Sequence, residues 1–252
     1  MPYTAFHLIL GTQLWKDVNR GIRKLPHENE MADMYDLTVE KLNKFGMSRY
    51  EVSNFSKGTT NQCNHNIGYW NGKDYIGIGP GAHSRFRPFD INEPISQQIA
   101  AYSMRGKIQN IKTVSSAEKI RDARIQTLEP EAWMREVEVT GHGTRKIDSL
   151  TPKDVLSEIL ATGLRTENGI SENIWLHKLH EVSTHSKSYT QKILELTLQS
   201  IVDGENCKKF ITNGSLILSG NNNLRLSQRG LKYLDHILPY LVCSLYERMK
   251  DY

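Results

Sequence analysis

Between Glu30 and Phe45, apolar side chains recur every three or four positions. This spacing lines one face of an α-helix. Thr38 is the one polar residue on that face, and Gly46 follows as a helix-ending glycine. The pattern predicts an amphipathic helix over 30–45, with an apolar face made of Met31, Met34, Tyr35, Val39, Leu42 and Phe45.

The pattern changes after Gly46. Residues 48–56, SRYEVSNFS, alternate in a way that is typical of a strand. Residues 74–84, DYIGIGPGAHS, predict a second strand, over 75–83, that runs into a glycine-rich loop. The alternation of helix and strand indicates α/β organisation, and we infer parallel strands from it.

The middle of the chain is less regular. A helix is predicted near 95–105, ending at Gly106. Ser115 and Glu118 have the spacing of a capping box, which predicts a second helix over about 116–128. The polar stretch 129–150 is interpreted as a connector.

The last third predicts a small α+β domain. Thr151 and Pro152 open a helix that ends at Gly163, and Ser171 opens a short helix over 171–180. Three features follow: a helix over about 188–203 that ends at Gly204, a hairpin turn at Asn213-Gly214, and a last helix over 228–247 capped by Ser227. The order is winged-helix-like. The last helix is not strongly basic, which favours a packing domain over a DNA-binding one.

Composition narrows the class of protein. The 252 residues are 38% hydrophobic and 24% charged, with a net charge of +4 and no dense Lys/Arg block. We therefore expect no nucleic-acid partner. No apolar run reaches the roughly 18–20 residues of a membrane span, and the N-terminus has no convincing signal or transit peptide. The odd number of cysteines and their wide spacing argue against a disulfide framework, and the chain contains no CxxC motif. The three are Cys63, Cys207 and Cys243.

Residues 61–70, NQCNHNIGYW, concentrate a soft ligand, an imidazole, amides and two large aromatic rings. Such a segment can bind a ligand. It can also be an Asn-rich turn anchored on the core by its aromatic side chains. The glycines of 75–83 likewise permit close approach of a ligand to the backbone, or serve only as a turn.

Together, YEVSNFS, HNIGYW and DYIGIGPGAHS resemble the HemW-type branch of the radical SAM coproporphyrinogen-oxidase-like family. Two further stretches, ARIQTLEPEAWMREVEVTGHGTRK and EILATGLRTENGI, resemble its animal mitochondrial members. The resemblance runs from about Gly11 to the C-terminus. It implies the C-terminal half of a (β/α)6-type partial barrel over 1–112, a helix and connector over 113–150, and a HemN-type, winged-helix-like domain over 151–252.

The resemblance also implies functional residues. The family's His-Asn-x-x-Tyr-Trp motif is linked to heme and falls on His65, Asn66, Tyr69 and Trp70. An imidazole is a common axial ligand of heme iron, so His65 is the first candidate ligand and Cys63 its rival. Tyr69 and Trp70 are candidates to cover the macrocycle, and Arg85 and Arg87 to pair with its propionates. In the same way Gly79, Gly81 and Ala82 are expected beside the adenine of S-adenosylmethionine.

One departure from the family changes the expectation. The CxxxCxxC motif that holds the family's four-iron four-sulfur cluster is absent, and Ile9-Leu10 stand where an acidic residue precedes Gly11-Thr12. We expect a fragment, a short isoform or an incomplete gene model, with no cluster and no catalysis of its own. Residues 1–110 would then expose an unpaired sheet edge and be poorly stable.

Three functions remain open. The first is a heme-binding protein that delivers heme to acceptor proteins, mitochondrial by resemblance and otherwise cytoplasmic. The second is a radical SAM oxidoreductase of the oxygen-independent coproporphyrinogen III oxidase type, in a full-length parent. The third is a non-catalytic winged-helix interaction module.

Overall fold

The computed structural model describes residues 11–87, 111–112, 120–186, 189 and 191–252. Helices and strands are mixed, which confirms the α/β class, and the described strands form no closed barrel. The predicted helix near 95–105 lies outside the described residues. The division of the chain at residues 112 and 150 stays a prediction.

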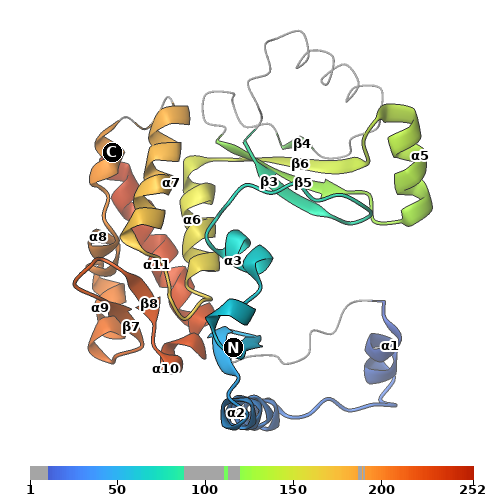
Figure 1. Ribbon diagram of the computed structural model, residues 1–252, viewed down its shortest axis with the longest axis horizontal. Helices are drawn as coiled ribbons and strands as arrows, with labels where there is room; N and C mark the ends of the chain where they lie inside the picture. The colour runs from blue at the N-terminus through green and yellow to red at the C-terminus, as the bar shows by residue number, and fades with distance from the viewer. Residues whose placement is uncertain (1–10, 88–110, 113–119, 187–188, 190) are drawn as a thin grey trace.

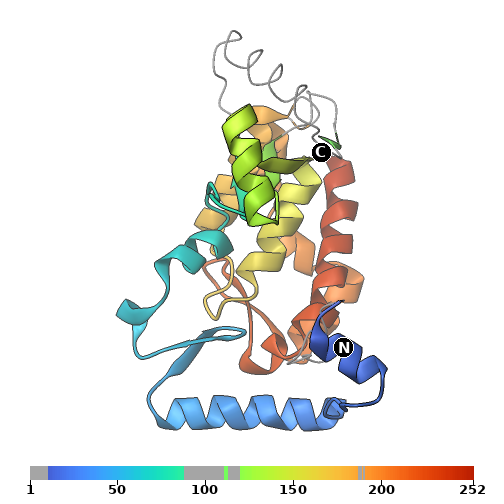
Figure 2. The same cartoon turned by 90° about the vertical axis from the view of Figure 1, so that its right-hand side faces the viewer.

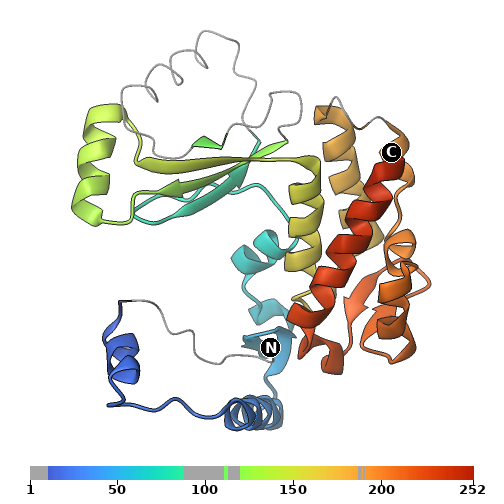
Figure 3. The ribbon, with the colours of Figure 1, turned by 180° about the vertical axis from the view of Figure 1, so that it is seen from behind.

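The C-terminal helical layer is the densest part of the molecule. Its helices are α6 (Pro152–Gly163), α7 (Glu172–His185), α8 (Leu198–Val202), α9 (Glu205–Thr212), α10 (Gln228–Leu231) and α11 (Leu234–Arg248), with the short η2 (Gln191–Glu195) and η3 (Met249–Asp251). A two-stranded hairpin, β7 (Leu216–Leu218) with β8 (Leu224–Leu226), packs at one end. Figure 3 shows α11 lying along α6, and residues of both helices belong to one buried apolar cluster.

Four strands form the main sheet, in the order β3 (His83–Phe86), β5 (Arg121–Gln126), β6 (Thr144–Leu150), β4 (Ile111–Lys112). The prediction of parallel strands is wrong for most of this sheet, because only β4 and β6 run parallel. Helix α5 (Pro130–Thr140) stands at the end of the sheet in Figure 1 and does not cross its face. A helix in that position returns the chain in the opposite direction, so alternation alone did not determine strand direction.

The N-terminal part is more open. It comprises α1 (Gln13–Asn19), α2 (Glu28–Lys44), the hairpin of β1 (Ser48–Glu51) and β2 (Asn54–Ser56), the short η1 (Thr59–Asn61) and α3 (Asn64–Trp70). Figure 2 shows α2 running crosswise beneath the C-terminal helices. It is attached there by an ion pair between Lys232 and Asp36. The prediction of a helix over 30–45 is confirmed, and Gly46 follows with a positive φ of 72°.

Two predicted strands differ from the structure. Residues 48–56 fold as an antiparallel hairpin instead of a single strand. The Glu51 carboxylate forms its turn, accepting hydrogen bonds from the Ser53 backbone N–H and the Asn54 side chain, at 2.9 and 2.7 Å. Residues 75–83 are not a strand either: Tyr75 makes an isolated bridge to Arg85, and the strand begins only at His83.

Two predictions in the middle of the chain are wrong. The predicted helix over 116–128 contains strand β5, and the predicted connector over 129–150 contains α5 and β6. Sheet pairing on both sides buries the first residues of β5 and overrides the local capping signal. Glu129 caps α5 and Pro130 takes its first position, a helix-start signal that the interpretation as a connector overlooked.

In the C-terminal third, the structure agrees better with the predicted elements. Helix α6 matches its prediction, and Ser171 caps α7 as expected. The predicted helix over 188–203 is wrong in extent, since the described part holds η2 and α8. Asn213-Gly214 ends α9 instead of turning a hairpin, and the hairpin's own turn lies at 219–223. Ser227 caps α10, after which the helix is interrupted and resumes as α11.

Candidate functional site

The segment HNIGYW forms helix α3, which begins after Cys63 and ends at Trp70. Residues four apart lie on the same face of a helix, whereas adjacent residues point about 100° apart. His65 and Tyr69 therefore share one face, and Trp70 lies on another. Of the five candidate heme-binding residues, the structure thus brings two into contact.

His65 and Tyr69 form an aromatic cluster with Tyr75. The Tyr69 hydroxyl and His65 Nε2 are in hydrogen-bond contact, and the two rings meet edge-on at 4.3 Å between centroids. The Tyr69 ring also lies against the Tyr75 ring, with centroids 4.1 Å apart. We call these three side chains the His65–Tyr69–Tyr75 cluster. Burial, reinforced by Glu158 and Tyr69 and opposed by Arg85, raises the pKa of Tyr75, so its phenol stays protonated at neutral pH.

Trp70 anchors the other side of α3. Its ring meets Tyr50 edge-on at 5.9 Å, and both line a cavity of about 320 Å³ with Asn71, Asn168 and Ile174. The Trp70 carbonyl accepts a hydrogen bond of 3.2 Å from the Thr162 hydroxyl on α6. Trp70 therefore holds α3 against the C-terminal helical layer.

The other two candidates lie at the edges of this arrangement. Cys63 is exposed at the N-cap of α3, where its backbone N–H donates to the Tyr50 hydroxyl at 3.3 Å. Asn66 lies between the two faces and is partly exposed.

The glycine-rich loop at 77–82 returns the chain to strand β5. Gly81 N–H donates to the Thr127 carbonyl at 2.8 Å, and the Ala82 carbonyl accepts from Gln126 at 2.9 Å. Gly79 has a φ of 107°, and among the described residues no atom beyond its chain neighbours lies within 4 Å of where its side chain would be. As far as these residues show, the space beside Gly79 is open to a ligand, whereas Gly81 faces the Leu128 side chain at 3.2 Å.

A charge cluster that is buried except at Asp74, and that sequence reasoning missed, holds the end of α3 on the side of the sheet. Arg121 on β5 donates to the carbonyls of Gly72 and Lys73, each at 3.2 Å, and to the Asp74 carboxylate at 2.5 Å. These acceptors directly follow α3. Because arginine presents several donors in a fixed fork, one side chain fixes three consecutive residues.

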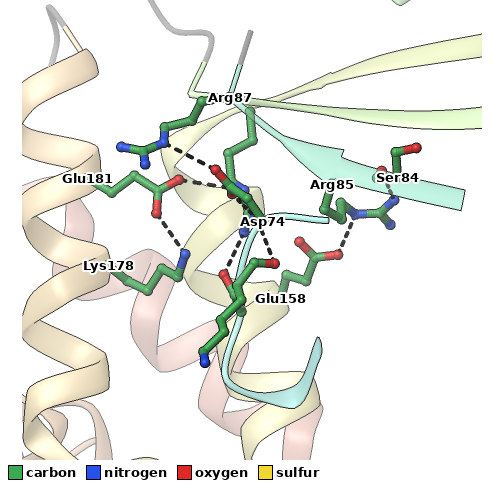
Figure 4. Close-up of polar contacts among 10 residues, drawn as sticks. Asp74, Ser84, Arg85, Arg87, Glu158, Lys178 and Glu181 are labelled. Atoms are coloured by element: carbon green, nitrogen blue, oxygen red, sulfur yellow. Dashed lines mark hydrogen bonds and ion pairs between the residues drawn. The ribbon is translucent and has the colours of Figure 1, made fainter. Parts of the chain in front are cut away.

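Helix α7 contributes the other half of this cluster. Lys178 donates to Glu181 at 2.7 Å, and Glu181 lies 3.6 Å from Arg121 Nε (Figure 4). Burial, with Arg121 adding and Glu181 opposing, lowers the pKa of Lys178. We define Asp74, Arg121, Lys178 and Glu181 as the Arg121 cluster. A sequence signal for it was available in the i, i+3 spacing of Lys178 and Glu181, but the partner on β5 requires the fold.

The two arginines expected to meet propionates are already paired. Arg85 Nε donates to Glu158 on α6 at 2.7 Å, and Arg87 Nε lies 3.4 Å from Asp74 (Figure 4). The Arg87 side chain is 45% exposed and its ion pair is therefore weak. Arg87 is thus the more accessible of the two for a carboxylate ligand.

Within the part of the chain that the structure describes, no three His, Cys, Asp or Glu side chains gather as a metal site. Cys63, Cys207 and Cys243 are free thiols. None of the described helices combines the length and the apolar character that crossing a membrane requires.

Comparison with known proteins shows which proteins this chain is similar to. No family model matches the chain. It is 34% identical over 235 residues to radical S-adenosyl methionine domain-containing protein 1, mitochondrial, from Danio rerio, an alignment that covers 93% of this chain and 44% of the relative. The Bos taurus protein of the same name is also 34% identical, with 94% and 45% covered. The chain is therefore homologous to radical S-adenosyl methionine domain-containing protein 1 over more than nine tenths of its own length.

A more distant relative is the heme chaperone HemW of Bacillus subtilis, 27% identical over 64% of this chain and 44% of the relative. Among solved structures, the Escherichia coli coproporphyrinogen III oxidase HemN superposes with a TM-score of 0.49 at 11% identity, covering 86% of this chain and 42% of that one. The chain spans less than half the length of the curated relatives it matches.

Proposed function

We propose that this protein binds heme at helix α3 and passes it to acceptor proteins, with heme as cargo instead of a resident cofactor. Relatives named heme chaperone HemW support heme as the cargo, and relatives named mitochondrial support a location in that organelle. The observation that carries the proposal is the His65–Tyr69–Tyr75 cluster. It combines groups able to ligate iron with two aromatic rings at one end of α3.

The surroundings of the cluster fit a flat, apolar molecule with carboxylates at its edge. Ile76 and Ile78 follow Tyr75 and are 64% and 85% exposed, so apolar surface continues beyond the rings. Arg87, directly after β3, supplies a cation for a propionate. Because the cavity beside Trp70 has only about 320 Å³, we assign Trp70 to anchoring α3 and place the macrocycle on the His65 face.

The residues of the glycine-rich loop retain the role implied by the family. We propose that Gly79, Gly81 and Ala82 would lie beside S-adenosylmethionine where a cluster-bearing half is present. In this chain Cys63, Cys207 and Cys243 are the cysteines, and they do not form the CxxxCxxC motif. Iron and sulfide reconstitution of this chain should therefore give no stoichiometric four-iron cluster, and one supported by these cysteines would contradict the assignment.

The test of heme binding is a titration of ferric heme into the complete chain, followed by its Soret band. The variant His65→Ala/Tyr69→Ala should bind at least about tenfold more weakly, since it loses both iron-ligating groups and one ring. Tyr233→Ala removes an exposed tyrosine at the start of α11 and serves as the matched control. Cys63→Ser tests the rival ligand.

Equal affinity of the parent and the double variant would place heme elsewhere on the chain. Delivery is measured separately, by mixing the loaded protein with an apo-hemoprotein whose own spectrum reports uptake. Uptake that is no faster than from free heme would leave binding without a chaperone role.

A further inference from the structure

The hydrogen bond between His65 and Tyr69 bears on which atom meets the iron. Imidazole binds a metal through a nitrogen lone pair, and in neutral histidine only one of the two nitrogens has one. If Nε2 has the lone pair, it accepts the Tyr69 O–H; if Nε2 has the proton, it donates to the Tyr69 oxygen. In either tautomer Nε2 has no free lone pair for iron.

The remaining nitrogen, Nδ1, is poorly placed for a large ligand. It is bonded to the ring carbon that carries Cβ, so a macrocycle centred on it would approach the backbone of α3 and its neighbouring turn. The Tyr69 oxygen combines two features that neither imidazole nitrogen has together, namely a free lone pair and a position away from the backbone. It stands at the far end of its side chain, and donation of its proton to His65 leaves its own lone pairs unused.

We propose that Tyr69 Oη, and not His65, is the axial ligand that this chain offers to ferric heme, with His65 Nε2 as the acceptor of the phenol proton. This rests on the proposed function. In the binding step the Fe–O bond forms, the O–H bond of Tyr69 breaks, and the proton moves to His65 Nε2. No electron is transferred, so no oxidant or reductant is required.

The chemistry of the pair supports this assignment. A phenolate is a known axial ligand of heme iron, and its negative charge suits the ferric state. Protonated imidazole then donates to the bound oxygen, in a charge-assisted hydrogen bond. The i, i+4 spacing keeps the acceptor beside the hydroxyl throughout, so the proton has a fixed destination.

Tyr69 is also held from its other side. Its ring lies against Tyr75, whose backbone exchanges two hydrogen bonds with Arg85, at 2.6 and 3.0 Å. Arg85 is in turn bound to Glu158 at 2.7 Å. The ring of Tyr69 is therefore positioned by strand β3 and helix α6, whereas His65 contacts it from within α3 alone.

The experiment uses the complete chain loaded with ferric heme, and three variants: Tyr69→Phe, His65→Ala and Tyr233→Phe. Tyr69→Phe preserves the ring and its stacking and removes only the hydroxyl. Tyr233→Phe is the matched control, because it removes an exposed phenol at the start of α11, outside the His65–Tyr69–Tyr75 cluster. Circular dichroism checks that each variant folds.

The readout is the ligand signature of the iron, observed as the phenolate-to-iron charge-transfer band and the phenolate vibrations enhanced with it in resonance Raman spectra. We expect both in the parent and in Tyr233→Phe, and neither in Tyr69→Phe. His65→Ala should retain them while heme affinity falls about tenfold, the loss expected for a hydrogen bond to a charged group.

Two results would overturn the inference. If Tyr69→Phe retains the spectrum of the parent while His65→Ala or Cys63→Ser changes it, another side chain is the ligand, although heme binding itself stands. If the parent binds no heme at defined stoichiometry, both the inference and the proposed function fail.

Discussion

The C-terminal helical layer and the N-terminal pair of helices use apolar residues in opposite ways. Leu156, Leu160, Leu179 and Leu241 in the layer are completely buried. Helix α2 buries only Met31, α1 buries no residue, and Ile22 and Phe45 are 67% and 76% exposed. The layer is therefore stabilised by its own packing, while α1 and α2 gain little from contacts with the described remainder of the chain.

The contrast has a functional side, because α3 lies between these two regions. It is tied to the layer through Thr162 and to the sheet through Arg121. A ligand that meets α3 thus contacts a helix with rigid support on one side and open surface on the other. That arrangement suits a carrier, which has to hold its cargo and also give it up.

Hydrogen exchange on the complete chain should show the largest effect. Amides of α6 and α11 should approach the protection of global unfolding, whereas those of α1 should exchange nearly as fast as an unfolded peptide. The physical reason is that α1 can open without exposing any buried side chain. Protection of α1 equal to that of α6 would remove the distinction between the two regions.

Separate expression sharpens the same comparison. A chain of residues 151–252 retains most of the apolar cluster and should fold alone, whereas 1–110 should not. Cooperative thermal unfolding is the measurement. A monomeric 1–110 fragment that unfolds cooperatively would mean that the N-terminal part has a core of its own.

Replacing one leucine in the C-terminal helical layer and one in α2 measures how much each region contributes to the free energy of unfolding. Leu160→Ala in α6 should lower the free energy of unfolding by about 2–5 kcal/mol, because it opens a cavity in a closely packed core. Leu37→Ala in α2 should change it by less than about 0.5 kcal/mol, since that side chain is 51% exposed. Urea titration of the two variants measures both values, and similar losses would contradict the contrast.

The Arg121 cluster tests how the segment that follows α3 is held to the C-terminal helical layer. Lys178→Met should cost about 3–5 kcal/mol, because it leaves Glu181 buried with only a 3.6 Å contact to Arg121. Lys178→Met with Glu181→Leu removes both charges and should recover much of the loss. A double variant as unstable as the single one would show that the pair itself, and not its unpaired charge, stabilises the fold.

The pH dependence of that loss follows from the lowered pKa of Lys178. Its folded-state pKa lies below the usual lysine value of 10.5, so the unfolded chain binds more protons in the interval between the two. The parent should therefore gain stability relative to Lys178→Met as pH rises through that interval towards 10.5. A constant difference across the interval would contradict the burial of this amine.

How much of this could be read from the sequence depends on whether a signal is local. Helices α2, α6 and α7 were predicted, because their apolar spacing and N-terminal caps lie within a few consecutive residues. Strand β5 was missed, since its burial comes from the neighbouring strands. The same holds for the site: His65 and Tyr69 were named from their motif, but their hydrogen bond, and the anchoring role of Trp70, required the helical geometry of α3.

The smallest expected effect lies at His142, in the turn between α5 and β6. Burial, with Arg124 adding and Glu136 opposing, lowers the pKa of this imidazole below 6.5. Its Nδ1 accepts a hydrogen bond of 3.2 Å from the Thr144 backbone, which requires the neutral ring. Because the unfolded chain takes up the proton first, the free energy of unfolding should fall as pH drops below about 6.5.

His142→Asn retains a polar side chain without titrating, and exposed His83 supplies the control His83→Asn. Denaturation at neutral and mildly acidic pH should show that the free energy of unfolding falls less for His142→Asn than for the parent or the control. If it falls equally for all three proteins, the turn that holds His142 is as hydrated as the open N-terminal surface.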